Sequence, residues 1–147
     1  MDNAQIVPSK IHLTNIKTVK ENTVLYNEKL DIKPIYDIQV SHSMMHNLDK
    51  ELVKIRLYLD ISAEISGKTI NQGGNYEIDF FFKIEDLKDH YQINNEKPLF
   101  GGVFVCTLLA ISYSTLRGMM FNLWRDTYLN SIILPIINVP DLLKSKR

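Results

Sequence analysis

The sequence of 147 residues has only one cysteine and no excess of charge of either sign. Each of these features excludes some classes of protein. Cys106 cannot form a disulfide within the chain, which favours a reducing compartment. Lysine and arginine number 17, as do aspartate and glutamate, so the chain lacks the basic field of a dedicated nucleic-acid binder. Met1 to Ala4 begin no apolar run of the kind that a secretory signal has. We therefore expect a cytoplasmic protein that does not bind nucleic acid.

Motifs for metals, phosphates and catalysis are also missing. The histidines have neither cysteine partners nor HExxH spacing, so no metal site is expected at His12, His42, His46 or His90. No Ser-His-Asp or Cys-His arrangement can be recognised from the spacing. We expect neither a cofactor nor an enzyme.

Two further segments have structural interpretations. Gly73 and Gly74 lack the following Lys-Ser/Thr of a phosphate-binding loop, so we interpret residues 66–75 as a turn-rich segment before a strand. Glu77 and Asp79 alternate with apolar residues and are expected on a solvated acidic face.

The composition is that of a globular domain. Apolar residues make up 45 % and charged residues 23 % of the chain, close to the averages for folded proteins. A chain of this length can bury a core without metal or disulfide support. We expect residues 1–147 to form a single domain.

Alternating apolar residues predict strands within the first 90 residues. The clearest runs are Val53 to Ile61 and Ile78 to Ile84, and Tyr36 to Met44 repeats the pattern. A fourth run, Ile11 to Ile16, slips in phase by one residue, as a β-bulge would cause. Clean alternation is typical of an antiparallel sheet with one covered face.

From Gly102 the apolar spacing becomes that of a helix, with a stripe that reaches Trp124. A second apolar set, Leu108, Ile111 and Met119, is expected on an adjacent face. One sheet cannot cover both faces, so the second must meet another subunit or a ligand. We expect an oligomer interface at Ile111 and Met119.

The same region raises the question of a membrane span. Leu99 to Leu116 is uncharged over 18 residues, the lower limit for a span. Five hydroxyl-bearing residues within it, and Arg117 directly after it, favour a helix buried on more than one face. We expect no stable membrane insertion.

Two prolines shape the end of the chain. Pro135 and Pro140 enforce extended backbone, and Pro140 also suits the first turn of a short helix over Asp141 to Lys146. The whole pattern predicts an α+β fold: a four-stranded antiparallel sheet followed by a long helix packed on it, an extended proline-containing connector and a short C-terminal helix.

Four short segments carry a family resemblance. Ile32-Lys33-Pro34 looks like an aromatic-x-Pro entry to a second strand, and Leu59 to Ala63 looks like a third strand before a glycine turn. Phe82-Lys83-Ile84 looks like a Phe-x-Ile strand end, and residues 134–143 look like a proline-containing connector into a last helix. With the order of elements, these segments resemble the SecB family of protein-export chaperones.

The resemblance implies a chaperone, export- or antitoxin-related, that holds non-native polypeptides such as a preprotein or an antitoxin in apolar grooves. Without a phosphate-binding loop, this holding is expected to be ATP-independent. The resemblance further implies a cytoplasmic homotetramer, a dimer of dimers with the long helices between dimers, and SecA as a partner of family members. The chain departs from the family in its balanced charge, in Gly73-Gly74 preceding the fourth strand, and in the basic segment Lys144 to Arg147.

We expect the polypeptide-binding groove between the loop before the second strand and the terminal helix. Its expected lining residues flank Pro34 and Pro140 and are Leu30, Ile32, Leu142 and Leu143. The resemblance adds Tyr113 as a wall. Alternatively, these leucines pin the short helix to the sheet.

A function of another class stays open at this point. The same pattern fits an oligomeric α+β ligand-binding protein, or an enzyme, with a pocket between helix and sheet. Such a small-molecule protein would not respond to an unfolded chain, whereas a chaperone would.

Overall fold

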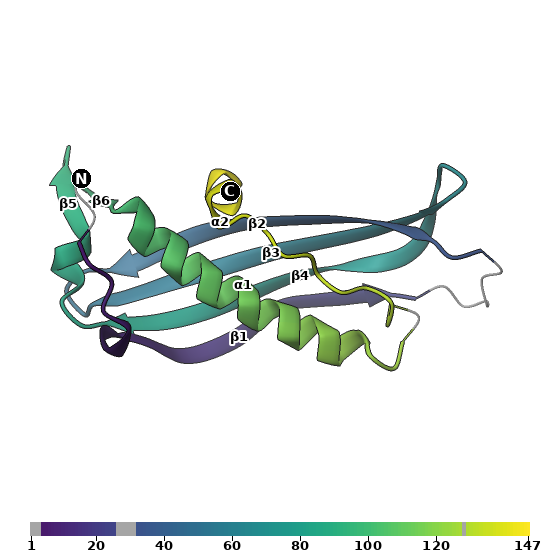
Figure 1. Ribbon diagram of the computed structural model, residues 1–147, viewed down its shortest axis with the longest axis horizontal. Helices are drawn as coiled ribbons and strands as arrows, with labels where there is room; N and C mark the ends of the chain where they lie inside the picture. Colours follow the sequence, from purple (N-terminus) through teal and green to yellow (C-terminus); the bar gives the residue numbers. More distant parts are fainter. Residues whose placement is uncertain (1–3, 26–31, 128) are drawn as a thin grey trace.

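The computed structural model describes residues 4–25, 32–127 and 129–147 (Figure 1). Its main sheet has four antiparallel strands in the order β1-β4-β3-β2, and α1 crosses one face of this sheet. The elements are η1 (Pro8–Lys10), β1 (Ile11–Val24), β2 (Ile35–Asn47), β3 (Leu52–Ile65), β4 (Lys68–Ile84), η2 (Leu87–His90), β5 (Tyr91–Asn94), β6 (Lys97–Phe100), α1 (Gly102–Trp124) and α2 (Val139–Lys144). The expected α+β arrangement of sheet, long helix, connector and short helix is confirmed.

The core lies between α1 and the sheet. In β3, the alternate residues from Val53 to Ile61 are at most 6 % exposed, and the residues between them point to the open face of the sheet. Leu108 is fully buried in this core, so its expected place on the second face of the helix was wrong. Ile111 and Met119 are half-buried and pack against the edge of the core.

The phase slip near the start of β1 is a register irregularity, as expected. The pairing with β4 shifts between Leu13 and Asn15, and again between Thr18 and Lys20. An extra residue in one strand of a pair locally interrupts the ladder. β1 is therefore an irregular edge strand, whereas β2, at the other edge, pairs with β3 without any shift.

The interpretation of residues 66–75 as a turn-rich segment was wrong. The chain turns at Ser66 and Gly67, and Gly73 and Gly74 lie within β4, paired with β1 and β3. Gly73 has a φ of 142°, and a Cβ on it would overlap the carbonyl oxygen of Ile61. The two glycines thus mark a close backbone approach inside a strand, and they do not precede the fourth strand as expected.

A Gly73→Ala variant is expected to lose about 1–3 kcal/mol of stability, because alanine disfavours this φ and its Cβ has no space. Urea unfolding followed by circular dichroism would measure the loss. The matched control is Gly67→Ala, which also has a positive φ but has no atom within 4 Å of the added Cβ. Equal losses of stability for the two variants would show that the close approach of Gly73 to Ile61 has no effect of its own.

A second, two-stranded sheet was not expected from the sequence. β5 and β6 pair through a turn at Asn95 and Glu96, whose φ values are 49° and 64°. Two successive positive φ values are typical of the type I′ turn of a hairpin. The turn uses no glycine, so it gave little signal.

The acidic face expected on the open side of the sheet is not solvated at Asp79. This carboxylate is 3 % exposed and accepts hydrogen bonds from Arg56, at 2.7 Å from Nε and 3.0 Å from the second guanidinium nitrogen. Lys54 Nζ lies 3.6 Å away. Burial alone would raise the pKa of Asp79, but Arg56 and Lys54 outweigh it and hold that pKa below its usual value.

Candidate functional site

Two apolar hollows lie on either side of Leu143, and we call them together the α2 groove. The hollow toward α1 has a volume of about 580 Å³ and is lined by Gly102, Val103, Cys106, Thr107, Ala110, Val139, Pro140 and Leu143. The hollow toward β2 has a volume of about 330 Å³ and is lined by His42, Met44, His46, Pro98, Leu99, Phe100, Val105, Leu143 and Lys146. Leu143 therefore forms a ridge between two spaces, each large enough for apolar side chains.

The position of α2 is fixed by burial and by the backbone of β2. Leu142 is 2 % exposed and belongs to the core. After α2, the His42 N–H donates to the Ser145 carbonyl at 3.3 Å, and the Arg147 N–H donates to the His42 carbonyl at 2.7 Å. Residues 145–147 thus form a short parallel bridge to the edge of β2. Because Leu142 anchors the helix, the adjacent Leu143 faces the groove.

The side chain of Arg147 ties the same segment to the open face of the sheet. Its guanidinium donates to Asp60 at 3.0 Å and lies 4.1 Å from the centre of the Tyr58 ring. The chain end therefore passes around the edge of β2 from the helix side to the open side. Such exposed ion pairs contribute little stability singly, but with the backbone bridge they define the path of the segment.

His42 lies beneath this bridge. It is 1 % exposed, and Nδ1 has no hydrogen-bond partner in the described part of the chain. Burial lowers the pKa of His42, and the charge of Lys146 acts in the same direction, while a contact with the Leu142 backbone opposes them. The β2 side of the α2 groove therefore presents a neutral imidazole.

Aromatic rings form the wall of the groove at the β5–β6 hairpin. The ring of Phe100 lies 5.9 Å from that of Phe104 on α1 and 5.5 Å from that of His46 on β2. His90 also stacks on Phe104, with 4.5 Å between the ring centres. These contacts join the hairpin, α1 and β2, so the unexpected hairpin is a structural part of the groove.

The connector between the helices adds exposed apolar surface. Ile133 is 64 % and Ile136 86 % exposed. Tyr113 donates its hydroxyl to the Pro135 carbonyl at 2.6 Å, and Arg117 Nε donates to the Leu134 carbonyl at 2.9 Å. Burial raises the pKa of Tyr113 to about 12, although Arg117 opposes this, so its hydroxyl remains a donor at neutral pH. The connector is thus bound to α1 through its carbonyls while its isoleucines point outward.

The expected groove residues fall in different places. Leu143 lines both hollows, whereas Leu142 and Tyr113 are buried beside them. Ile32 is 59 % exposed but precedes β2, and the eight residues from Ile35 to His42 span about 23 Å of strand. Leu30 lies outside the described residues. The structure therefore does not bring Ile32 and Leu143 together.

Most of the groove was missed by reasoning from sequence. Val103 and Cys106 are in the first turns of α1, and Leu99 is in the hairpin, where the sequence suggested only a continuous apolar run. Val103 is 47 % exposed at the start of α1, and nothing in the sequence indicated that it would line a groove. Met44 lines the hollow toward β2 only because α2 packs beside it, and the position of α2 could not be predicted from the sequence.

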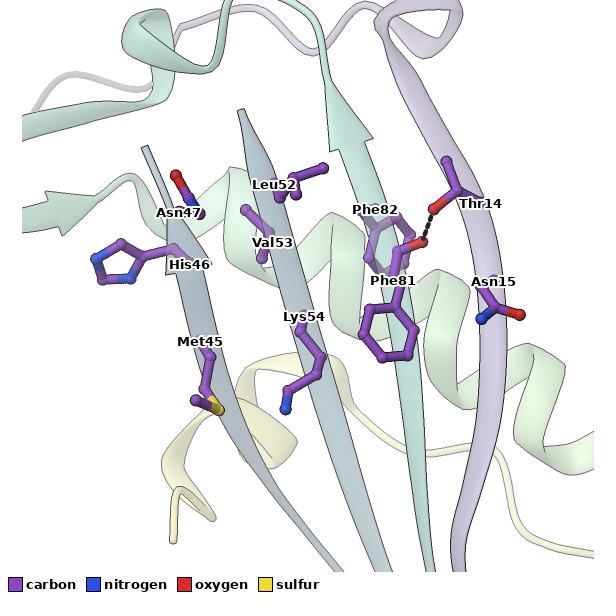
Figure 2. A pocket seen from close by; sticks show the side chains of 10 residues that line it. All are labelled: Thr14, Asn15, Met45, His46, Asn47, Leu52, Val53, Lys54, Phe81 and Phe82. Carbon is purple, nitrogen blue, oxygen red and sulfur yellow. Dashed lines mark hydrogen bonds between the residues drawn. The ribbon is translucent and has the colours of Figure 1, made fainter. Parts of the chain in front are cut away.

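A separate apolar hollow of about 340 Å³ lies on the open face of the sheet, opposite α1 (Figure 2). Phe81 and Lys54 line it, with Met45 and Leu52 at its sides. Phe81 is held by its strand, where its carbonyl accepts a hydrogen bond from Thr14 at 3.1 Å. Most of this surface lies on the face of the sheet opposite α1, and His46, near the end of β2, lines both it and the α2 groove.

The space between α1 and the sheet is occupied by core side chains. Ile55, Phe80, Leu108 and Leu109 each have 0 % exposure there. Residues 4–25, 32–127 and 129–147 contain no group of three His, Cys, Asp or Glu side chains placed to hold a metal ion. α1 is long and apolar enough to cross a membrane by composition alone, but its buried face belongs to this core.

The fold is that of a SecB-like chaperone. The chain matches the solved structure of the SecB-like chaperone Rv1957 of Mycobacterium tuberculosis, which is in complex with a ChAD peptide from the antitoxin HigA1. The TM-score is 0.65 at 10 % sequence identity, and the match covers 88 % of this chain and 92 % of the other. No family model and no curated protein matches the sequence. The resemblance to SecB-like proteins is thus confirmed in the fold.

Proposed function

We propose that the protein is an ATP-independent chaperone that holds non-native polypeptides in the α2 groove. The observation that carries the proposal is the pair of apolar hollows around Leu143 on a SecB-like fold. Exposed apolar hollows of this kind suit unfolded segments, whose apolar side chains lack a core of their own. The antitoxin peptide held by the structural neighbour supports a polypeptide client such as an antitoxin, and a preprotein is the other client that we propose.

The groove extends the expected set of binding residues. Leu143 contacts the client directly, while Leu142 and Tyr113 support the groove from below. A client that reaches both Leu143 and Ile32, at the far end of β2, has to be extended over at least eight residues. A role for Leu30 remains part of the proposal.

The assembly and location follow from the same proposal. The protein acts in the cytoplasm as a homo-oligomer, a tetramer by resemblance, with Ile111 and Met119 in the interface. Phe121, which is 54 % exposed on α1, adds apolar surface that an oligomer would cover. SecA is a partner only if the function is protein export; a dedicated antitoxin chaperone has no need of it.

A Leu143→Ser, Val103→Ser variant is expected to hold unfolded protein at least about tenfold less effectively, because it removes apolar contact area from the hollow toward α1 and from the ridge. Light scattering of insulin, which aggregates when its disulfides are reduced, measures the effect without ATP. The melting temperature should change little, since neither side chain is fully buried.

The matched control is Met45→Ser, which removes an apolar side chain that is 58 % exposed on the open face of the sheet. This variant should hold insulin as the wild type does. Ile32→Ser, measured separately, tests whether the client reaches the far end of β2. Full activity of the Leu143→Ser, Val103→Ser variant, or a wild type that leaves the scattering unchanged, would contradict the proposal.

A further inference from the structure

The edge of β2 offers a row of backbone groups that the fold leaves open. β2 is the last strand of the sheet order, with β3 on one side only. Both the N–H and the carbonyl of His42 point away from β3, because both bond to residues 145–147. Direction alternates along a strand, and the pairing of β2 with β3 is continuous, so Tyr36, Ile38 and Val40 also direct their backbone groups outward.

This part of the edge is uncovered. In the portion of the chain that the structure describes, no backbone hydrogen bond reaches the outer edge of β2 between Tyr36 and Val40. Figure 1 shows α2 beside the middle of β2, with the first part of the strand extending beyond it. Residues 35–41 contain no proline, no lysine and no bulge, and Asp37 is their one charged side chain. β1, the opposite edge, has Lys17, Lys20 and two irregularities.

The side chains of β2 along this edge are apolar on the helix side of the sheet and polar on the open side. Tyr36, Ile38 and Val40 are half-buried and pack against the core on the helix side. Asp37 and Gln39, which lie between them, point to the open side, where Arg147 already pairs with Asp60 of the next strand. A strand added here would gain apolar contacts on one face and favour basic or neutral polar side chains on the other.

We propose that the client binds partly by strand addition: an extended client segment with apolar residues at alternate positions and basic or polar residues between them pairs with the backbone of β2 from Tyr36 to Val40. Residues 145–147 show that this edge accepts a further strand, since they already form such a bridge at His42. Backbone pairing is largely independent of client sequence, which suits the holding of unfolded chains. The inference rests on the proposed function and specifies how the client is recognised.

The probe is the seven-residue peptide Val-Lys-Val-Thr-Val-Lys-Val-amide with fluorescein attached to its N-terminus, and its binding is followed by fluorescence anisotropy. Two derivatives carry N-methyl groups on one or the other set of alternate amides. The derivative whose methylated amides face β2 should bind at least tenfold more weakly than the unmethylated peptide. The other derivative should bind less than threefold more weakly. Equal effects of the two sets would overturn strand addition.

Two protein variants and one further peptide complete the test. Val40→Pro removes the outward N–H and should weaken binding at least fivefold more than Val40→Ala, which removes only side-chain volume; no difference between them would contradict the inference. A peptide with glutamate in place of both lysines should bind at least threefold more weakly because of Asp37, and equal binding would overturn the charge preference. If the wild type prevents insulin aggregation but none of the expected peptide results is obtained, strand addition is rejected and the proposed function is retained.

Discussion

A Trp124→Ala variant is expected to lose about 3–5 kcal/mol of folding free energy, the range for truncation of a large buried aromatic residue. Trp124 is 1 % exposed at the end of α1 and makes an edge contact with the Tyr76 ring of β4, 5.9 Å between centres. Its indole N–H donates to the Tyr76 hydroxyl at 3.0 Å. The same hydroxyl lies 2.6 Å from Thr23 Oγ1 on β1. One side chain thus joins α1 to two strands.

Trp124→Phe separates packing from the hydrogen bond. It keeps most of the apolar volume and removes only the N–H, and Tyr76 retains Thr23 as a partner, so a loss of about 1 kcal/mol is expected. Urea unfolding has to be followed by circular dichroism, because both variants lack the single tryptophan. A loss below 1 kcal/mol for Trp124→Ala would show that α1 does not need this anchor.

Substituting Ile111 and Met119 together by aspartate is expected to dissociate the proposed oligomer completely. Both side chains are half-buried at the margin of the core, and two carboxylates in an apolar interface would be desolvated without partners. Sedimentation velocity at micromolar concentration measures the change in mass. Circular dichroism should show that the β-sheet remains.

Phe121→Asp provides a variant in which the fold is less affected, because Phe121 is 54 % exposed. It should weaken the oligomer if the interface extends along α1. Ile93→Asp, at an exposed position in the β5–β6 hairpin, is the matched control and should leave the mass unchanged. A wild type that sediments as a compact monomer would remove the basis of this prediction.

The parts of the fold that depend on local periodicity could be predicted from the sequence. Alternation from Val53 to Ile61 identified β3, and the phase slip after Leu13 identified the irregularity in β1. The change of period at Gly102 located the start of α1. Pro140 marked the first turn of α2, although this helix is Val139–Lys144 and not Asp141 to Lys146 as expected. In each case neighbouring residues carry the information that determines the structure.

What could not be predicted depends on contacts between distant residues. Gly73 looked like a turn because its close approach to Ile61 is visible only once β3 and β4 are paired. Asp79 looked solvated because the positions of Arg56 and Lys54 over it depend on the same register. The groove around Leu143 depends on where α2 packs against β2, and the sequence around Pro140 does not specify that contact.

The order of elements along the chain also matters during translation. All four strands of the main sheet are complete at Ile84, before the ribosome adds the first residue of α1. Until α1 is made, the sheet has an uncovered apolar face, with Ile55 and Phe80 among the residues that α1 later buries. Once made, α1 is apolar enough to enter a bilayer, but it meets a docking face that already exists. A nascent chain that stops before Trp124 lacks this cover, so premature termination should yield an aggregating product.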